Sequence, residues 1–217
     1  MDCLLVISSH LDDAVLSAGQ LIAGRPDTVV ATVFAGSPSR PSPLTTYDQN
    51  CGFTSAQQAV TRRRREDRVA LGLLGATHVH LDFLDHQYGE PADEKVIAAR
   101  LGEVVAEHDA WALLGPLGLA HPDHHTVRRA YAGLVRGCPD LEAWVYEDLP
   151  ARVLWPEQVG EGLAWWRGMG WEPTLGFFGT GPLEQKEEAV AAYRSQAWAL
   201  SNHSYLVPER LHCLWPC

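Results

Sequence analysis

The chain opens with a short apolar run that ends in a cluster of charged side chains. Residues 3–8 are almost entirely apolar, which is typical of a strand buried inside a parallel sheet. His10, Asp12 and Asp13 follow directly, and apolar residues at helical spacing resume over residues 14–22. An imidazole and two carboxylates at a strand-to-helix turn cost stability unless something binds them. A divalent metal is the simplest such ligand.

A second strand follows at 28–34, where β-branched residues dominate. The helix between the two strands is expected to end at Gly24. A strand, a helix and a strand in this order form a βαβ unit, whose strands are parallel and whose crossover is right-handed. The sequence therefore predicts an α/β fold with a mostly parallel sheet and helices on both faces.

The rest of the chain continues the alternation of strands and helices. Further helices are predicted at 55–75, 93–108, 123–137 and 183–199, and further strands at 78–84, 111–114, 142–146 and 172–178. The stretch 36–54 is predicted to be a long loop, either a lid over a substrate or a surface insertion. Without a linker or a repeat, we expect one domain over 1–217, with a core at about 1–150 that residues 151–217 complete.

Composition excludes several classes of partner. The formal net charge of −10 argues against nucleic acid or an anionic membrane as a general partner. The 5 cysteines are scattered without a C-x-x-C pair, which argues against a disulfide scaffold or a cysteine-rich zinc knuckle. No apolar stretch reaches the length of a membrane span and no basic leader opens the chain, so a cytoplasmic protein is expected. Its oligomeric state is not predicted.

A second polar cluster follows the strand predicted at 111–114. It contains His121, Asp123 and His124. In open α/β sheets, ligands bind beyond the carboxyl ends of the strands where the strand order reverses. With the strand order 3-2-1-4-5, the first and fourth strands are neighbours at that point. We therefore expect the two polar clusters to face each other across one crevice.

Histidine and carboxylate ligands without thiolate suit zinc in an open catalytic site, or iron(II). Two histidines and one carboxylate leave coordination positions for water and substrate, and an unligated carboxylate can then act as a general base. The same ligand set occurs in non-haem iron oxygenases, although the βαβ order does not suit the β-barrel expected of those enzymes. A catalytically inactive metal-binding subunit is a further alternative.

Both clusters resemble the motifs of a known family. His10-Leu11-Asp12-Asp13 and His121-Pro122-Asp123-His124 match the LmbE-like, or PIG-L-like, N-acetylglucosaminyl deacetylases, which are metal-dependent amide hydrolases with a Rossmann-like fold. Three further features are similar to the family's: Arg63-Arg64-Arg65-Glu66 with Leu73-Leu74-Gly75, Asp85, and Lys186 with Tyr193-Arg194-Ser195-Gln196. The resemblance spans nearly the whole chain. Leu11 departs from the proline of many members.

The resemblance implies a role for each residue of the two motifs. The implied metal ligands are His10, Asp13 and His124. Asp12 would be the general base, and His121 would stabilise the developing oxyanion or protonate the leaving amine. Asp123 would orient His121 through a hydrogen bond.

Substrate contacts are less well defined by the sequence. Arg63 and Asp85 are candidates for contacts with sugar hydroxyl groups. Of the four consecutive arginines 62–65, at most one or two can face a site, because consecutive residues cover all sides of a helix. His86 is interpreted as an ordinary loop histidine, and the many tryptophans after residue 144 as packing residues.

Together these features predict a zinc-dependent hydrolase, with Fe²⁺ as the alternative metal. It would remove an N-acetyl or related acyl group from a small amino sugar or glycoside by means of a metal-activated water. An amidase acting on a thiol-sugar conjugate or a secondary metabolite is the second hypothesis. The motifs do not separate the two, because substrate choice is expected to depend on residues 36–54 and on the C-terminal third.

Overall fold

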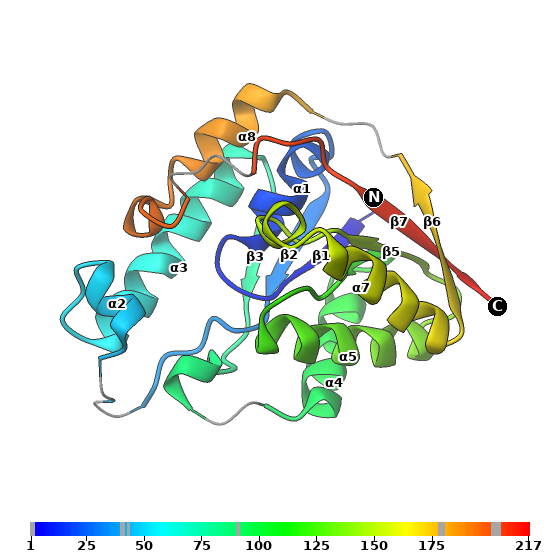
Figure 1. Ribbon diagram of the computed structural model, residues 1–217, viewed down its shortest axis with the longest axis horizontal. Helices are drawn as coiled ribbons and strands as arrows, with labels where there is room; N and C mark the ends of the chain where they lie inside the picture. The colour runs from blue at the N-terminus through cyan, green and yellow to red at the C-terminus, as the bar shows by residue number, and fades with distance from the viewer. Residues whose placement is uncertain (1–2, 40–41, 43, 90–91, 178–180, 201–204) are drawn as a thin grey trace.

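The computed structural model describes residues 3–39, 42, 44–89, 92–177, 181–200 and 205–217. Its strands form one mixed sheet in the order β3-β2-β1-β4-β5-β7-β6 (Figure 1). The strands are β1 (Cys3–Ser8), β2 (Thr28–Thr32), β3 (Thr77–His80), β4 (Ala110–Pro116), β5 (Glu142–Tyr146), β6 (Trp171–Gly176) and β7 (Leu211–Pro216). The first five are parallel, which confirms the predicted order 3-2-1-4-5.

Helices cover both faces of the sheet (Figure 1). They are α1 (Asp13–Ala23), α2 (Thr46–Asn50), α3 (Ala56–Leu73), α4 (Glu94–Glu107), α5 (Pro122–Gly137), α6 (Ala151–Leu154), α7 (Glu157–Gly168) and α8 (Leu183–Val190), with 3₁₀ turns η1 (His86–Tyr88) and η2 (Arg194–Gln196). Helices α1, α3 and α8 pack on one face, and α4, α5 and α7 on the other. No described helix is long and apolar enough to span a membrane.

The central strand β1 shows why the sheet is buried on both sides. All six of its residues are buried, and alternate side chains enter opposite cores. Leu4 packs with α1 and α3, whereas Leu5 packs with α4 and α5. A continuous apolar run is therefore required here, because both faces of the strand are covered.

Helix boundaries follow local capping signals. Helix α3 begins after Ser55, whose side chain accepts a hydrogen bond from the backbone N–H of Gln58. Helix α4 begins after Asp93, which accepts from the N–H of Lys95. These caps explain why the helices predicted at 55–75 and 93–108 lie within two residues of their observed bounds.

Three predictions were wrong in detail. The predicted loop 36–54 contains the short helix α2, while its residues 40, 41 and 43 lie outside the described part. The helix predicted at 183–199 ends at Val190, and the strand predicted at 78–84 ends at His80. Strand β7 was not predicted. It runs antiparallel between β5 and β6, so its partners on both sides are distant in sequence and its pairing leaves no local signal.

Candidate active site

The first polar cluster lies in a tight turn at the carboxyl end of β1. Ser8 Oγ donates to the carbonyl of His10 at 2.7 Å and accepts from the backbone N–H of Ala14 at 3.0 Å. The backbone N–H of His10 donates to Asp13 Oδ2 at 2.8 Å. These bonds fold the turn so that both the His10 ring and the Asp13 carboxylate face the end of β4.

Three ligand-type atoms from the two clusters converge on one position. His10 Nδ1 and Asp13 Oδ2 are 3.2 Å apart, and His124 Nε2 lies 3.1 Å from the same oxygen. The two ring nitrogens are 3.2 Å apart. The structure thus brings together the residues that the resemblance implies as metal ligands.

Two buried carboxylates fix the orientation of both rings. Asp123 Oδ2 lies 3.0 Å from His10 Nε2, and Asp148 Oδ1 lies 2.7 Å from His124 Nδ1. Each contact places the ring proton on the nitrogen that faces the carboxylate, so the opposite nitrogen of a neutral ring carries a lone pair. Two such lone pairs and a carboxylate oxygen then point at one another.

This donor set fits a divalent cation. Bonds of about 2.0–2.1 Å in a tetrahedral site place ligand atoms about 3.3 Å apart, close to the separations found here. Without a positive charge between them, the lone pairs of the two ring nitrogens and the carboxylate oxygen would repel one another. The combination of nitrogen and oxygen donors suits zinc or iron(II).

The local charges favour a cation at the same place. Burial alone would lower the pKa of His124, but the carboxylates of Asp13 and Asp148 outweigh it and raise that pKa to about 10. Burial would raise the pKa of Asp13, but His124 and His10 hold it well below its ordinary value. The site therefore stabilises positive charge.

Asp12 differs from its neighbour Asp13. Its half-buried side chain lines the pocket, and although it occupies the N-cap position of α1 it makes no capping bond. Among the described residues, none donates a hydrogen bond to this carboxylate. Burial and the adjacent Asp13 raise the pKa of Asp12 to about 7. An unoccupied carboxylate that takes up a proton near neutrality has the properties of a general base.

His121 lies on the opposite side of the pocket, at the N-cap of α5. Its Nδ1 accepts the backbone N–H of Asp123 at 3.2 Å, which leaves the proton of the neutral ring on Nε2. Burial, together with His10 and His124, lowers the pKa of His121 to about 4. His121 is therefore neutral near pH 7 and can donate a hydrogen bond from Nε2.

The carboxylate of Asp123 does not make the expected hydrogen bond to His121. Its Oδ2 lies 3.9 Å from His121 Nδ1 and instead contacts His10 Nε2 and accepts the backbone N–H of His86, at 3.0 and 3.2 Å. The reason is local, because His121 caps the helix and so turns its Nδ1 toward a backbone amide.

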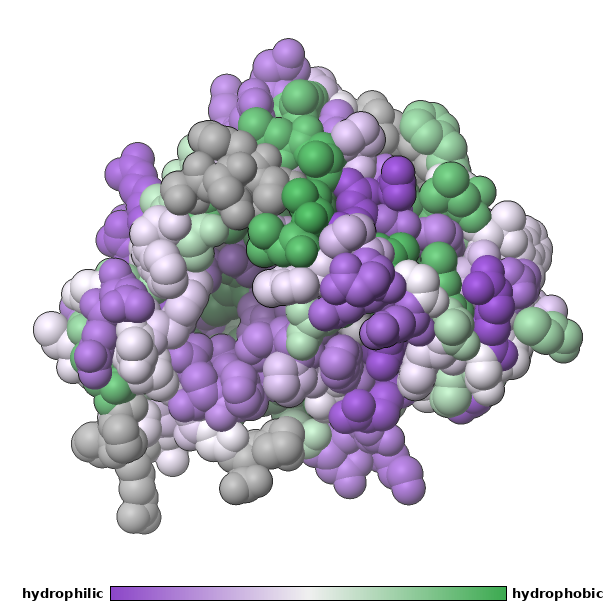
Figure 2. All heavy atoms as spheres, viewed as in Figure 1, coloured by the Kyte–Doolittle hydropathy of each residue, from purple (hydrophilic) through white to green (hydrophobic). Residues whose placement is uncertain are grey.

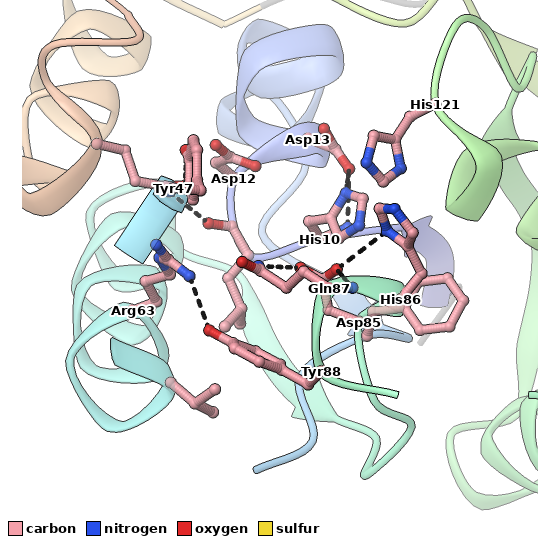
Figure 3. A pocket seen from close by; sticks show the side chains of 14 residues that line it. His10, Asp12, Asp13, Tyr47, Arg63, Asp85, His86, Gln87, Tyr88 and His121 are labelled. Atoms are coloured by element: carbon pink, nitrogen blue, oxygen red, sulfur yellow. Dashed lines mark hydrogen bonds and ion pairs between the residues drawn. The ribbon is translucent and has the colours of Figure 1, made fainter. Parts of the chain in front are cut away.

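One cavity of about 340 Å³ is lined by His10, Asp12, Asp13 and His121. It opens as a hollow on the face shown in Figure 2. Figure 3 shows Asp12, Asp13, His10 and His121 on one side and Arg63 and Tyr88 on the other. Both predicted substrate contacts, Arg63 and Asp85, line this cavity.

Several residues of the site were not predicted from the sequence. His86 was interpreted as an ordinary loop residue, but its ring packs edge-on against His121 with centroids 4.8 Å apart. Asp148 follows β5, and the rule that polar residues after buried strands form sites could have found it. Tyr47, Tyr88 and Gln196 line the cavity. Gln196 belongs to the family-like stretch Tyr193-Arg194-Ser195-Gln196 but was given no role in the site, whereas no local pattern marks Tyr47 or Tyr88.

Comparison with known proteins assigns the family. The model of the GlcNAc-PI de-N-acetylase family, PIG-L, matches residues 5–135, which include both polar clusters. The chain belongs to this family. It is accordingly an enzyme that hydrolyses N-acetyl amide bonds. Among curated proteins, none matches the chain.

Solved structures agree with this assignment over the full length. A triple mutant of a deacetylase involved in the teicoplanin biosynthetic pathway, Orf2*T, is 27% identical with a TM-score of 0.83, covering 99% of this chain and 98% of that one. The A40926 pseudoaglycone deacetylase Dbv21 is 27% identical with a TM-score of 0.78, covering 98% and 97%. The zinc-inhibited form of teicoplanin deacetylase Orf2 shares the fold, with a TM-score of 0.81 and 22% identity. That match covers 99% of this chain and 98% of the Orf2 chain.

Proposed function

We propose that this PIG-L family member removes the acetyl group from an acetamido sugar of a glycoside, releasing acetate and a free amine. The observation that supports it best is the convergence of His10, Asp13 and His124 beside an unpaired carboxylate in one cavity. A metal-dependent hydrolase needs a place for a cation, a base near it and room for substrate, and this cavity offers all three.

His10, Asp13 and His124 would hold the metal, for which we propose zinc, with Fe²⁺ as the alternative. A divalent metal bound there supplies a Lewis acid that acidifies water and polarises the amide carbonyl. Asp123 and Asp148 support the two histidines by accepting the outer ring N–H groups.

The remaining steps use the chain's own side chains. Asp12 accepts a proton as water adds to the carbonyl carbon of the acetamide. His121 donates a hydrogen bond from Nε2 to the oxygen on which negative charge develops. The C–N bond then breaks, and the proton held by Asp12 passes to the departing nitrogen. Water is consumed, and acetate and an amine are formed.

Arg63 is well placed to bind a sugar hydroxyl. Its side chain is almost fully buried, yet its Nε–H has no hydrogen-bond partner among the described residues. A buried unpaired donor at a pocket wall costs free energy that a ligand oxygen or a water would recover. Asp85 lines the same cavity and offers carboxylate oxygens, although Gln87 already donates to both.

A sugar carried by a larger secondary metabolite is the more specific candidate substrate. Two structures at 27% identity that cover nearly the whole chain are described as a deacetylase of the teicoplanin pathway and an A40926 pseudoaglycone deacetylase. This likeness favours a tailoring enzyme over one that acts on a free monosaccharide.

Release of acetate tests the proposal. The purified chain, loaded separately with zinc and with iron(II), is incubated with N-acetylglucosamine and with N-acetylglucosaminyl glycosides that have large aglycones. Acetate and amine are expected in equal amounts, with the larger glycosides hydrolysed faster. Consumption of oxygen without acetate release, for either metal, would instead support the oxygenase hypothesis.

A further inference from the structure

Helix α2 contributes Tyr47 to the lining of the cavity, and polar contacts attach the helix and its preceding residue to other residues of that lining. Thr45 Oγ1 donates to Gln87 Oε1 at 2.8 Å, and Tyr47 OH donates to Gln196 Oε1 at 3.0 Å. Both amide side chains line the cavity. Within α2 itself, Asp48 is the buried residue. The helix is thus held by hydrogen bonds and charge at the site, with little apolar burial of its own.

Asp48 makes a buried ion pair with Arg63 of α3. Its carboxylate oxygen Oδ1 lies 2.8 Å from Arg63 Nη2, and the two side chains are 0% and 7% exposed. Tyr88 OH donates to the other oxygen of Asp48 at 2.8 Å and accepts from Arg63 Nη1 at 3.3 Å. The three groups form a closed loop of polar contacts. Arg63 and Tyr88 lie on the side of the cavity opposite His10 and Asp13 (Figure 3).

The helix alone does not determine the position of the Arg63 side chain. An arginine side chain has many rotamers, and fixing one costs conformational entropy. Here the guanidinium lies against the rings of Tyr47 and Phe53, at 4.9 and 5.4 Å from their centroids. Asp48 adds the opposite charge, which a buried guanidinium needs. With Nη1 and Nη2 used inside the chain, Nε is left for a ligand.

We propose that Asp48 is a positioning residue that fixes Arg63 for contact with a sugar hydroxyl, so that α2 determines substrate specificity. This inference rests on the proposed function. Asp48 does not touch the substrate. It acts through Arg63, and it should therefore affect substrate binding far more than the chemical step.

The test is the steady-state kinetics of Asp48→Asn with the N-acetylated glycoside that the parent hydrolyses best. The variant keeps the shape of the side chain but removes its charge. We expect KM to rise about tenfold, as for loss of a hydrogen bond to a charged group, and kcat to stay within about twofold. The metal content should not change, because Asp48 is not among the residues that converge as metal ligands.

The chain offers a matched control in the next arginine of the same helix. Arg64 pairs with Asp82, whose side chain is 86% exposed and does not line the cavity. Asp82→Asn should leave KM within about twofold of the parent, since exposed ion pairs contribute little. If Asp82→Asn raises KM as much as Asp48→Asn does, loss of any carboxylate paired with an α3 arginine explains the effect and the proposal is wrong.

A double-mutant cycle tests whether Asp48 acts through Arg63. In an Arg63→Gln background, Asp48→Asn should have little further effect on KM, because the side chain that it positions is gone. Additive effects of the two substitutions would overturn the proposal, as would an unchanged KM in Asp48→Asn.

A second variant covers the case in which Asp48→Asn does not fold. Asp48→Glu keeps the buried charge but displaces the carboxylate, and it should raise KM by about threefold, with kcat unchanged. An unchanged KM would again contradict the proposal. Hydrolysis by the parent is measured in the same assay, so failure of the proposed function is seen separately, as absence of acetate from the parent.

Discussion

At the scale of single residues, adjacent aspartates have different environments. Asp13 faces two imidazoles, whereas no described residue donates to the side chain of Asp12. The backbone causes this difference, since consecutive side chains at the start of a helix point in different directions. The sequence alone indicated that one aspartate would bind a metal and one would not. The contacts show which one faces the imidazoles.

Replacing Asp12 tests its role as the base. Asp12→Asn should lower kcat by about 10²–10⁴-fold, the usual contribution of general acid–base catalysis. The variant should bind metal as the parent does, because Asp12 is not among the residues that converge as metal ligands. Metal analysis of the same preparation is the control, and full turnover by Asp12→Asn would show that another group takes the proton.

Asp148 should matter for metal affinity even though it lies behind the site. It holds the His124 ring at 2.7 Å, and loss of such an outer carboxylate costs about 10–100-fold in metal affinity or activity. Competition with a chelator measures this for Asp148→Asn. The exposed Asp140 provides the control, and Asp140→Asn should leave the affinity unchanged. Equal affinities for both variants would mean that Asp148 does not support His124.

At the scale of elements, α1 depends on the C-terminal part of the chain. The helix is interrupted at Ala18, and the carboxylate of Glu209 accepts the N–H groups of Gln20 and Leu21 at 2.8 and 3.1 Å. Lys186 of α8 is fully buried and pairs with the same carboxylate at 2.8 Å. Residues far apart in sequence therefore hold the helix that begins with Asp13.

Removing the charge of Glu209 should destabilise the fold. Glu209→Gln leaves Lys186 as a buried cation without a counter-charge, and breaking such a pair costs about 3–5 kcal/mol. Denaturant unfolding measures the change. Glu187→Gln, at an exposed site on α8, should change the free energy of unfolding by less than about 0.5 kcal/mol. A similar value for Glu209→Gln would show that the pair does not support α1.

Some of the helices and strands could be predicted from the sequence, and others could not. Periodicity and caps located α3, α4 and α5 because these signals lie within the helix itself. Strand β7 pairs with β5 and β6, and Glu209 accepts from Gln20 of α1. These partners are distant in sequence, and no local pattern encodes them. Helix α2 is only five residues long and is held mainly by polar contacts to the cavity.

At the scale of the whole molecule, the strand order places the site. Because β1 and β4 are neighbours, the turn after β1 and the start of α5 meet, and two motifs separated by more than a hundred residues form one centre. This could be predicted from the βαβ pattern together with the strand order 3-2-1-4-5. The position of the Asp123 carboxylate could not, since it depends on which nitrogen of His121 caps α5.

The central claim is that hydrolysis depends on a metal held by His10, Asp13 and His124. The most direct measurement titrates zinc or iron(II) into metal-stripped protein and follows acetate release from an N-acetylated glycoside. Activity should be absent at first, rise with added metal and level off at one equivalent per chain, and His124→Ala should remain inactive at that concentration. Full activity in stripped protein, or metal binding by His124→Ala as tight as that of the parent, would contradict the account.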